Sequence, residues 1–329
     1  MKVLVTGGCG FIASHLVEAL VARDCACHGD EVVVIDNLSS GSLVNLKGVS
    51  RDVMKLIVAD CAFEKIVQPE VEKADLVFHL AATVGVKRVM EDPVETISNM
   101  HDASQTVIEA CALYNKRLII TSSSEVYGAS TKEAFSEDDD CIIGPTTKSR
   151  WCYAAAKLMD EFLALAYHKS QGLPVTVARL FNTIGPRQSG QYGMVVPTFV
   201  RQALADKPLT IYGDGEQQRA FTSVHDVVKC LLALAECDAA IGGVVNVGSE
   251  NQIRIHQLAS WIWGEVNGHD VTAVVGELVN PKDAYGEDFV DMRHRKPDVS
   301  KLRRLIGFVP ETPLAEILKE IVEHERQLA

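Results

Sequence analysis

Tyr153 and Lys157 lie four residues apart in the segment YAAAK. On a helix this spacing places the phenol and the ammonium on one face. Because a neighbouring cation favours tyrosinate, we expect Lys157 to lower the pKa of Tyr153 and make it usable as a base near neutral pH. The same spacing also arises by chance on protein surfaces. A catalytic role therefore depends on what the rest of the chain places beside the pair.

A glycine-rich turn, TGGCGFIA, begins at Thr6, directly after an apolar strand pattern and directly before a helical one. Its glycines let the backbone turn tightly and approach a pyrophosphate, and the helix start offers free N–H groups to the phosphates. The second strand pattern ends close to Asp36, an acid suited to the ribose hydroxyls of adenosine. The NLS segment after it contains no arginine for a 2′-phosphate. The turn therefore predicts NAD as the cofactor in preference to NADP.

A third polar segment, SSSEVYG, begins at Ser122, where another strand pattern ends. With these motifs the sequence resembles the extended short-chain dehydrogenase/reductase family, in the branch that modifies nucleotide sugars. The resemblance covers nearly the whole chain and rests on TGGCGFIASHL, VIDNLSSG, VADC, HLAATVGV, SSSEVYG, YAAAK, RLFNTIGPRQ, YGDGEQQRAF and HRKPDVSK. Ala13 stands where many members have glycine, a change that a helix-packing position tolerates. The segment Asp24–Gly29 lengthens the first crossover and has no function that we can assign.

The resemblance implies a set of residues that bind NAD. These are Gly7, Gly10, Phe11 and Ile12 at the pyrophosphate, Asp36 and Asn37 at the adenosine end, Asp60 and Cys61 beside the adenine, Leu80, Ala81 and Ala82 along the groove, and Tyr153 and Lys157 at the nicotinamide ribose. It further implies that Tyr153, assisted by Ser123, takes the proton of the sugar C4 hydroxyl. Substrate contacts are implied for Asn182 and Arg219 at the diphosphate, and for Arg187 in the same segment.

The residues beside the catalytic serine bear on the fate of the 4-keto sugar once it has formed. A 4,6-dehydratase needs an Asp-Glu pair, and here the pair is Ser124-Glu125, so the acid is missing and this reaction is disfavoured. The Ser-Glu arrangement together with Arg295 resembles UDP-glucuronate decarboxylases. Glu125 would then orient the substrate, and Arg295 would supply a proton or stabilise charge at C5. We therefore expect a UDP-glucuronate decarboxylase.

Two alternatives stay open. A UDP-sugar 4-epimerase, acting on UDP-glucose or UDP-glucuronate, needs only the tyrosine, the lysine and the serine. A protein of this fold that binds a dinucleotide without catalysis usually lacks the tyrosine or the lysine, and both are present here.

The elements that must position these residues follow an α/β pattern. Strand patterns alternate with helical ones, which predicts a Rossmann-like, doubly wound parallel sheet. The strands are expected at Lys2–Val5, Glu31–Ile35, Lys55–Ala59, Leu76–Leu80, Arg117–Thr121 and Val175–Arg179, and the helices at Ile12–Arg23, Val94–Tyr114 and Tyr153–Ser170. From Asn182 the alternation breaks. We expect an NAD-binding domain over 1–181 and a smaller C-terminal substrate domain over 182–329, with a segment near 222–248 returning to the first sheet.

Composition limits the possible partners. The chain has 329 residues, 47% of them apolar, and a net charge of −12. This charge argues against binding to nucleic acid or to anionic membranes. The chain contains no apolar run of membrane-spanning length, and the opening MKVLVTGG leaves no room for a signal peptide. These features predict a cytoplasmic protein.

The nine cysteines are odd in number and irregularly spaced. Cys25, Cys27 and His28 resemble half of a metal site, but no second cluster completes four ligands, so we expect no metal and plain thiols in a reducing compartment. The family resemblance implies a homodimer built from the helices near Val94–Tyr114 and Tyr153–Ser170. Their apolar faces could equally belong to the core.

Overall fold

The computed structural model describes residues 1–22, 30–82, 92–190, 193–268, 276–285 and 295–328. The predicted segment Asp24–Gly29, with Cys25, Cys27 and His28, lies outside the described residues. Among the described residues, no helix has the length and apolar character needed to cross a bilayer.

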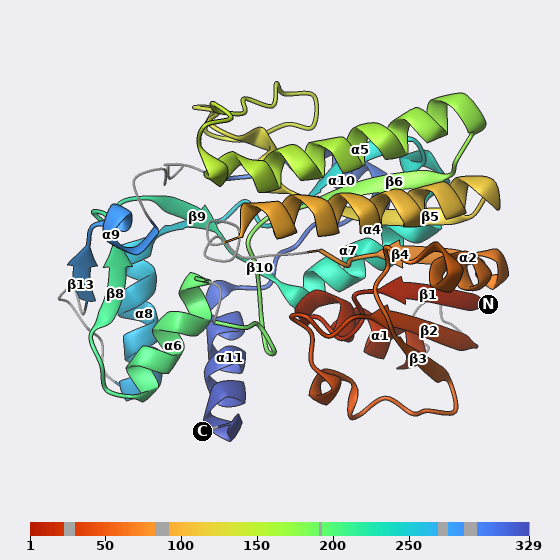
Figure 1. Ribbon diagram of the computed structural model, residues 1–329. Coiled ribbons are helices and arrows are strands. Elements are labelled where there is room, and N and C mark those ends of the chain that lie inside the picture. The colour runs from red at the N-terminus through yellow and green to blue at the C-terminus, as the bar shows by residue number, and fades with distance from the viewer. Residues whose placement is uncertain (23–29, 83–91, 191–192, 269–275, 286–294, 329) are drawn as a thin grey trace.

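A seven-stranded sheet forms the centre of the larger of two bodies in the fold (Figure 1). Its order is β11-β6-β5-β4-β1-β2-β3, and every neighbouring pair is parallel. The strands are β1 (Lys2–Thr6), β2 (Glu31–Asp36), β3 (Met54–Val58), β4 (Leu76–His79), β5 (Arg117–Ser123), β6 (Val175–Leu180) and β11 (Gly243–Val247). The first six lie within two residues of the strands expected from the sequence. The last, β11, comes from the part of the chain beyond Asn182.

Helices cover both faces of this sheet, because successive strand residues point to opposite faces. Val3 and Val5 pack on the same side as α1 (Phe11–Ala22), α7 (Val224–Glu236) and α10 (Ser300–Ile306). Leu4 packs on the other side with α2 (Glu64–Lys73), α4 (Pro93–Leu113) and α5 (Cys152–Gln171). The doubly wound α/β fold predicted from the sequence is confirmed.

Most of the chain beyond Asn182 forms a smaller body beside the sheet, in which α6 (Val195–Leu204), α8 (Ile255–Asn267) and α11 (Leu314–Leu328) share one core (Figure 1). Its short strands pair as β8 (Leu209–Tyr212) with β13 (Gly276–Val279), and as β9 (Gln218–Ala220) with β12 (Gln252–Arg254). The pair β7 (Thr183–Ile184) and β10 (Thr222–Ser223) links this body to the sheet, and α9 (Pro281–Tyr285) follows β13. The division into domains 1–181 and 182–329 stays a prediction.

Candidate active site

The glycine-rich turn is held between β1 and β2. Gly7 N donates to Ile35 O at 2.8 Å, and Gly10 N donates to Gly7 O at 2.9 Å. Gly7 has φ +71°, and a Cβ there would lie 2.8 Å from the Cα and the N of Ala81. Any larger residue would therefore push β1 and β4 apart. The glycine-rich turn leads directly into α1, so the free N–H groups at the start of this helix lie beside the glycines.

Asp36, the last residue of β2, braces this turn. Its Oδ2 accepts from Cys9 N at 2.9 Å and its Oδ1 accepts from Leu38 N at 2.7 Å. Burial raises the pKa of Asp36, although these two backbone bonds act in the opposite direction. Beside it, the Asn37 amide donates to Asp60 Oδ2 at 2.8 Å. A carboxylate oxygen can accept more than one hydrogen bond, so Asp36 can support the turn and still accept from a ribose hydroxyl.

One pocket of about 510 Å³ extends from this turn to the second body, which is the size range of small-molecule sites, roughly 300–1,000 Å³. Every residue that the sequence analysis assigned to cofactor, catalysis or substrate lines this pocket. They are Gly7, Gly10, Phe11, Ile12, Asp36, Asn37, Asp60, Cys61, Leu80, Ala81, Ala82, Ser123, Ser124, Glu125, Tyr153, Lys157, Asn182, Arg187, Arg219 and Arg295. The structure thus brings the predicted residues together, while their roles stay predictions.

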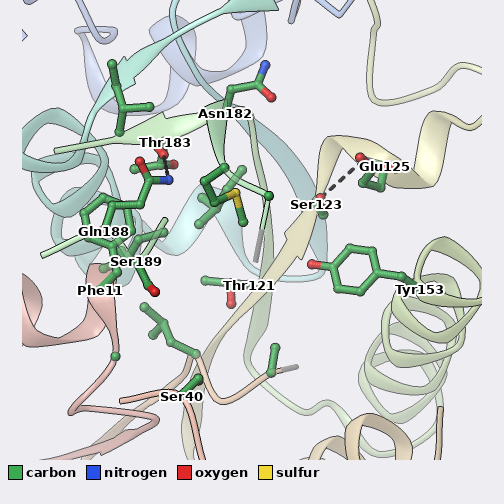
Figure 2. A pocket seen from close by; sticks show the side chains of 18 of the residues that line it. Phe11, Ser40, Thr121, Ser123, Glu125, Tyr153, Asn182, Thr183, Gln188 and Ser189 are labelled. Atoms are coloured by element: carbon green, nitrogen blue, oxygen red, sulfur yellow. Dashed lines mark hydrogen bonds between the residues drawn. The ribbon is translucent and has the colours of Figure 1, made fainter. Parts of the chain in front are cut away.

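Tyr153 projects from α5 toward the end of β5. Figure 2 shows its hydroxyl directed toward Ser123, with Thr121 alongside. Burial and the charge of Glu125 raise the pKa of Tyr153 to about 12, although a hydrogen bond with Ser123 opposes this shift. The sequence predicted a lowered pKa for Tyr153, and that prediction is wrong, because the surrounding residues raise it. The sequence showed the cation one turn away but could not show the burial or the carboxylate.

Lys157 lies one turn further along α5 and is almost completely buried, with 2% of its surface exposed. Its Nζ donates to Thr121 O at 3.1 Å and pairs with Asp160 Oδ2 at 3.3 Å. Since an ammonium has three N–H donors, one remains to be directed at a ligand in the pocket.

Glu125 is held between two buried arginines. Arg150 Nη2 lies 2.6 Å from Glu125 Oε2, and Arg295 Nη2 lies 2.7 Å from Glu125 Oε1. Burial would raise the pKa of Glu125, but the charges of Arg295 and Arg150 outweigh burial and lower it to about 2. Glu125 is therefore anionic at neutral pH, and the three-residue cluster carries one net positive charge.

Arg150 was not predicted as a site residue. It stands three residues before Tyr153, in the short helix η3 (Ser149–Trp151), and it also lines the pocket. Its position before the YAAAK segment was visible, but nothing in the spacing indicated a contact with Glu125, which is far away in the sequence.

The three predicted substrate residues have different surroundings. Asn182 donates to Ala220 O at 3.1 Å, and Arg219 follows Gln218 in β9 with 8% of its surface exposed. Arg187 turns toward α1, where Nη2 lies 2.7 Å from Glu18 and Nη1 donates to Ser14 at 3.2 Å. Gln188 and Thr183, which the sequence analysis did not single out, share the pocket wall with these residues (Figure 2).

Residues 3–248 match the profile of the NAD dependent epimerase/dehydratase family. The chain belongs to this family. A UDP-N-acetyl-alpha-D-glucosaminuronate decarboxylase of Bacillus cytotoxicus is 37% identical over 99% of this chain and 98% of its own length. UDP-glucuronic acid decarboxylase 1 of Arabidopsis thaliana is 34% identical over 99% of this chain and 70% of its own length. The solved UDP-glucuronic acid 4-epimerase of Bacillus cereus, in complex with UDP-glucuronic acid and NAD, is 30% identical and superposes with a TM-score of 0.85 over 100% of both chains.

This NAD-dependent epimerase/dehydratase is an enzyme, and NAD is its cofactor, as the sequence predicted. The turn fits the pyrophosphate, because Gly7 and Gly10 both line the pocket and neither carries a side chain. Tyr153 and Lys157 line the same pocket, and their contact with a nicotinamide ribose stays a prediction.

Asp36 should set the choice between the two dinucleotides. We expect the unaltered protein to bind NAD about 10-fold or more tightly than NADP, because a 2′-phosphate would meet the buried carboxylate. Asp36→Ala combined with Asn37→Arg should shift the preference toward NADP, as measured by calorimetric titration of each cofactor. Asn37→Arg alone keeps the carboxylate and is the matched control, with a smaller shift. Equal affinity of the unaltered protein for both cofactors would refute the role of Asp36.

Proposed function

We propose that this enzyme decarboxylates a UDP-hexuronate, with UDP-glucuronate as the first candidate substrate. The C4 hydroxyl is oxidised, the carboxylate leaves as carbon dioxide, and the 4-keto pentose is reduced to a UDP-pentose. The observation that carries this proposal is the buried Glu125–Arg150–Arg295 cluster beside Ser123 and Tyr153.

The residues around C4 perform a proton transfer in this proposal. Tyr153 accepts the proton of the C4 hydroxyl, and Ser123 hydrogen-bonds to the phenol and aligns it. Lys157 holds the ribose of the cofactor with the donor that Thr121 and Asp160 do not use. NAD, when bound, supplies the hydride acceptor that makes the 4-keto sugar and later returns the hydride.

The arginine cluster acts on the decarboxylation step. A 4-keto uronate is a β-keto acid, so loss of its carboxylate leaves electrons on an enolate. Arg295 brings a buried positive charge to this site, and Glu125 fixes its position, so the developing charge meets an oriented cation. A guanidinium stays protonated in proteins, which favours electrostatic stabilisation over proton donation by Arg295.

The same cluster argues against a 4,6-dehydratase. That reaction needs a protonated group to release the 6-hydroxyl, whereas the pKa of Glu125 is lowered to about 2 and Ser124 replaces the second acid. A 4-epimerase is the second candidate, because the Bacillus cereus structure is named for that reaction on UDP-glucuronic acid.

Product analysis tests the proposal directly. UDP-glucuronate, its 2-acetamido counterpart and UDP-glucose would each be incubated with the protein, and carbon dioxide and the sugar nucleotides measured. The 2-acetamido compound is included because the Bacillus cytotoxicus relative is named for it. We expect carbon dioxide and a UDP-pentose from at least one uronate, with no net consumption of NAD. A product of unchanged mass and inverted C4 would establish the epimerase instead.

We also propose that the enzyme is a homodimer through α4 and α5. Large apolar side chains are exposed on these two helices, with Val94 73%, Ile97 45%, Met159 56% and Phe162 68% exposed. Burying such a surface against a second copy is favourable. Sedimentation of the purified chain measures whether it is a dimer.

We further propose a cytoplasmic location and a nucleotide sugar as the partner. The seven described cysteines are all free thiols, which suits a reducing compartment.

A further inference from the structure

A continuous chain of buried polar side chains extends from the glycine-rich turn to Lys157. Thr6 Oγ1 lies 2.7 Å from His79 Nδ1, and His79 Nε2 lies 3.2 Å from Ser104 Oγ. Ser104 Oγ donates to Asp160 Oδ2 at 2.8 Å, and Lys157 Nζ donates to the same oxygen at 3.3 Å. All five side chains are less than one-tenth exposed. The chain crosses β1, β4, α4 and α5 beneath the cofactor groove.

The donors in this chain all point toward Asp160. Because Ser104 gives its proton to Asp160, its oxygen accepts from His79 Nε2–H, and His79 Nδ1 is left to accept from Thr6. Burial, together with the charge of Lys157, lowers the pKa of His79 to about 3, so its ring is neutral. Asp160 and Lys157 are therefore the charged members of the chain.

Asp160 is a buried carboxylate with one unpaired oxygen among the described residues. Its side chain is 3% exposed, and Oδ1 has no hydrogen-bond partner among the described residues. Placing a carboxylate in such surroundings is unfavourable unless the charge is paired. The adjacent Glu161 forms the ion pair with Arg179 that ties α5 to β6, so Asp160 is not needed for that contact.

We propose that Asp160 is a positioning residue for the catalytic pair. It takes one N–H of the Lys157 ammonium, so that the remaining donor is directed into the pocket, and its negative charge, together with that of Glu125, shifts the pH range in which Tyr153 works. This proposal rests on the proposed function, which gives Tyr153 and Lys157 their roles. It adds that the carboxylate seven residues after Tyr153 acts on both.

Several groups face these two residues. Ser123, Glu125, Arg295 and Asp160 act on Tyr153, and Asp160 is among the groups that raise its pKa. Asp160 is faced by Lys157 on its own helix, by Ser104 on α4 and by the neutral His79 on β4. Removing the Asp160 charge leaves the other groups in place, so the pKa of Tyr153 must fall. Seven residues along a helix span about 10 Å, and a unit charge at that distance shifts a pKa by about one unit at an effective dielectric constant of ~20.

The test uses Asp160→Asn, which keeps the shape and removes the charge. Tyrosinate formation would be followed by near-ultraviolet absorbance, and Tyr153 isolated by subtracting the same titration of the matching protein with Tyr153→Phe. We expect the titration of Tyr153 to move to lower pH by about one unit, and the acidic limb of turnover to move with it. This titration needs no substrate, so its outcome does not depend on which reaction the enzyme catalyses.

Two control variants separate charge from structure. Ser104→Ala removes a hydrogen bond to Asp160 but keeps the charge, and Glu161→Gln neutralises the next carboxylate on the helix. Both should leave the Tyr153 titration in place. If Asp160→Asn does not fold, as judged by circular dichroism, Asp160→Ser removes the same charge with a smaller side chain. An unmoved Tyr153 titration in a folded Asp160 variant would overturn the proposal and leave Asp160 a structural residue.

Discussion

Tyr153→Phe should lower turnover by about 10³-fold, the scale of a positioned acid–base group, while NAD binding and thermal unfolding stay close to those of the unaltered protein. The substitution removes one hydroxyl, which is directed toward Ser123 (Figure 2). The hydrophobic contacts of the ring and the donors of Lys157 are retained. Turnover would be measured from product formation, and cofactor affinity by calorimetry.

Tyr127→Phe is the matched control. Tyr127 is fully buried, donates to Asn246 Oδ1 at 2.7 Å and stacks on Phe135, outside the pocket lining. Losing this hydroxyl should reduce the free energy of unfolding by about 1–3 kcal/mol, because Asn246 loses a partner, and leave turnover nearly unchanged. Near-normal turnover in Tyr153→Phe would show that another group is the base.

Glu125→Gln should slow carbon dioxide release by about 10²-fold or more, and Arg295→Ala should do the same. The first leaves Arg150 and Arg295 without their shared carboxylate, so neither guanidinium keeps its orientation. The second removes the cation that would meet the enolate. Release of labelled carbon dioxide from UDP-glucuronate labelled in its carboxylate would be measured for each variant.

The pH dependence of unfolding provides a second measurement on Glu125→Gln. The pKa of Glu125 falls from its ordinary value of 4.5 to about 2 in the folded protein. Its contribution to stability is therefore complete above pH 4.5 and is lost as the pH falls toward 2. Glu125→Gln should therefore have a lower free energy of unfolding than the unaltered protein at neutral pH. Between pH 4.5 and 2 its free energy of unfolding should fall less steeply, because the variant has no carboxylate at this position to protonate.

Glu161→Gln is the control for Glu125→Gln, because it also neutralises a buried glutamate that pairs with an arginine. Glu161 and Arg179 are 4% and 5% exposed, and breaking their pair should cost about 3–5 kcal/mol of stability without a comparable loss of carbon dioxide release from the folded protein. If Glu125→Gln and Glu161→Gln impair release equally, Glu125 is a structural neighbour of the serine and nothing more.

The parts of the site that depend on local spacing could be predicted from the sequence. Gly7 and Asp36 lie where β1 and β2 end, and Tyr153 and Lys157 lie in the first two turns of α5. The periods of strand and helix then determine the direction of each side chain. Among the described helices, α1, α4 and α5 were predicted, whereas α2, α6, α7, α8, α9, α10 and α11 were not. Of the helices that were not predicted, α9 and α10 are too short to display a helical period.

The electrostatics of the site could not be predicted in the same way. Arg150, Glu125 and Arg295 come from three distant segments, and their contact exists only in the folded chain. The pKa of Tyr153 rises, where a fall was expected, because burial and the charge of Glu125 outweigh the hydrogen bond with Ser123 and the charge of Arg295. Arg187 lines the pocket as expected and also pairs with Glu18, a contact that the sequence did not reveal, and its substrate role stays a prediction.

The late arrival of β11 in the sequence has a consequence for biosynthesis. A ribosome releases β1 to β6 first, and at that point β6 has a row of backbone N–H and C=O groups with no neighbour. The partners Gly243–Val247 emerge more than sixty residues later, and they bond to β6 from Thr176 to Leu180. During that interval the nascent protein presents an open apolar strand edge, the kind of surface that pairs with other chains or recruits a chaperone.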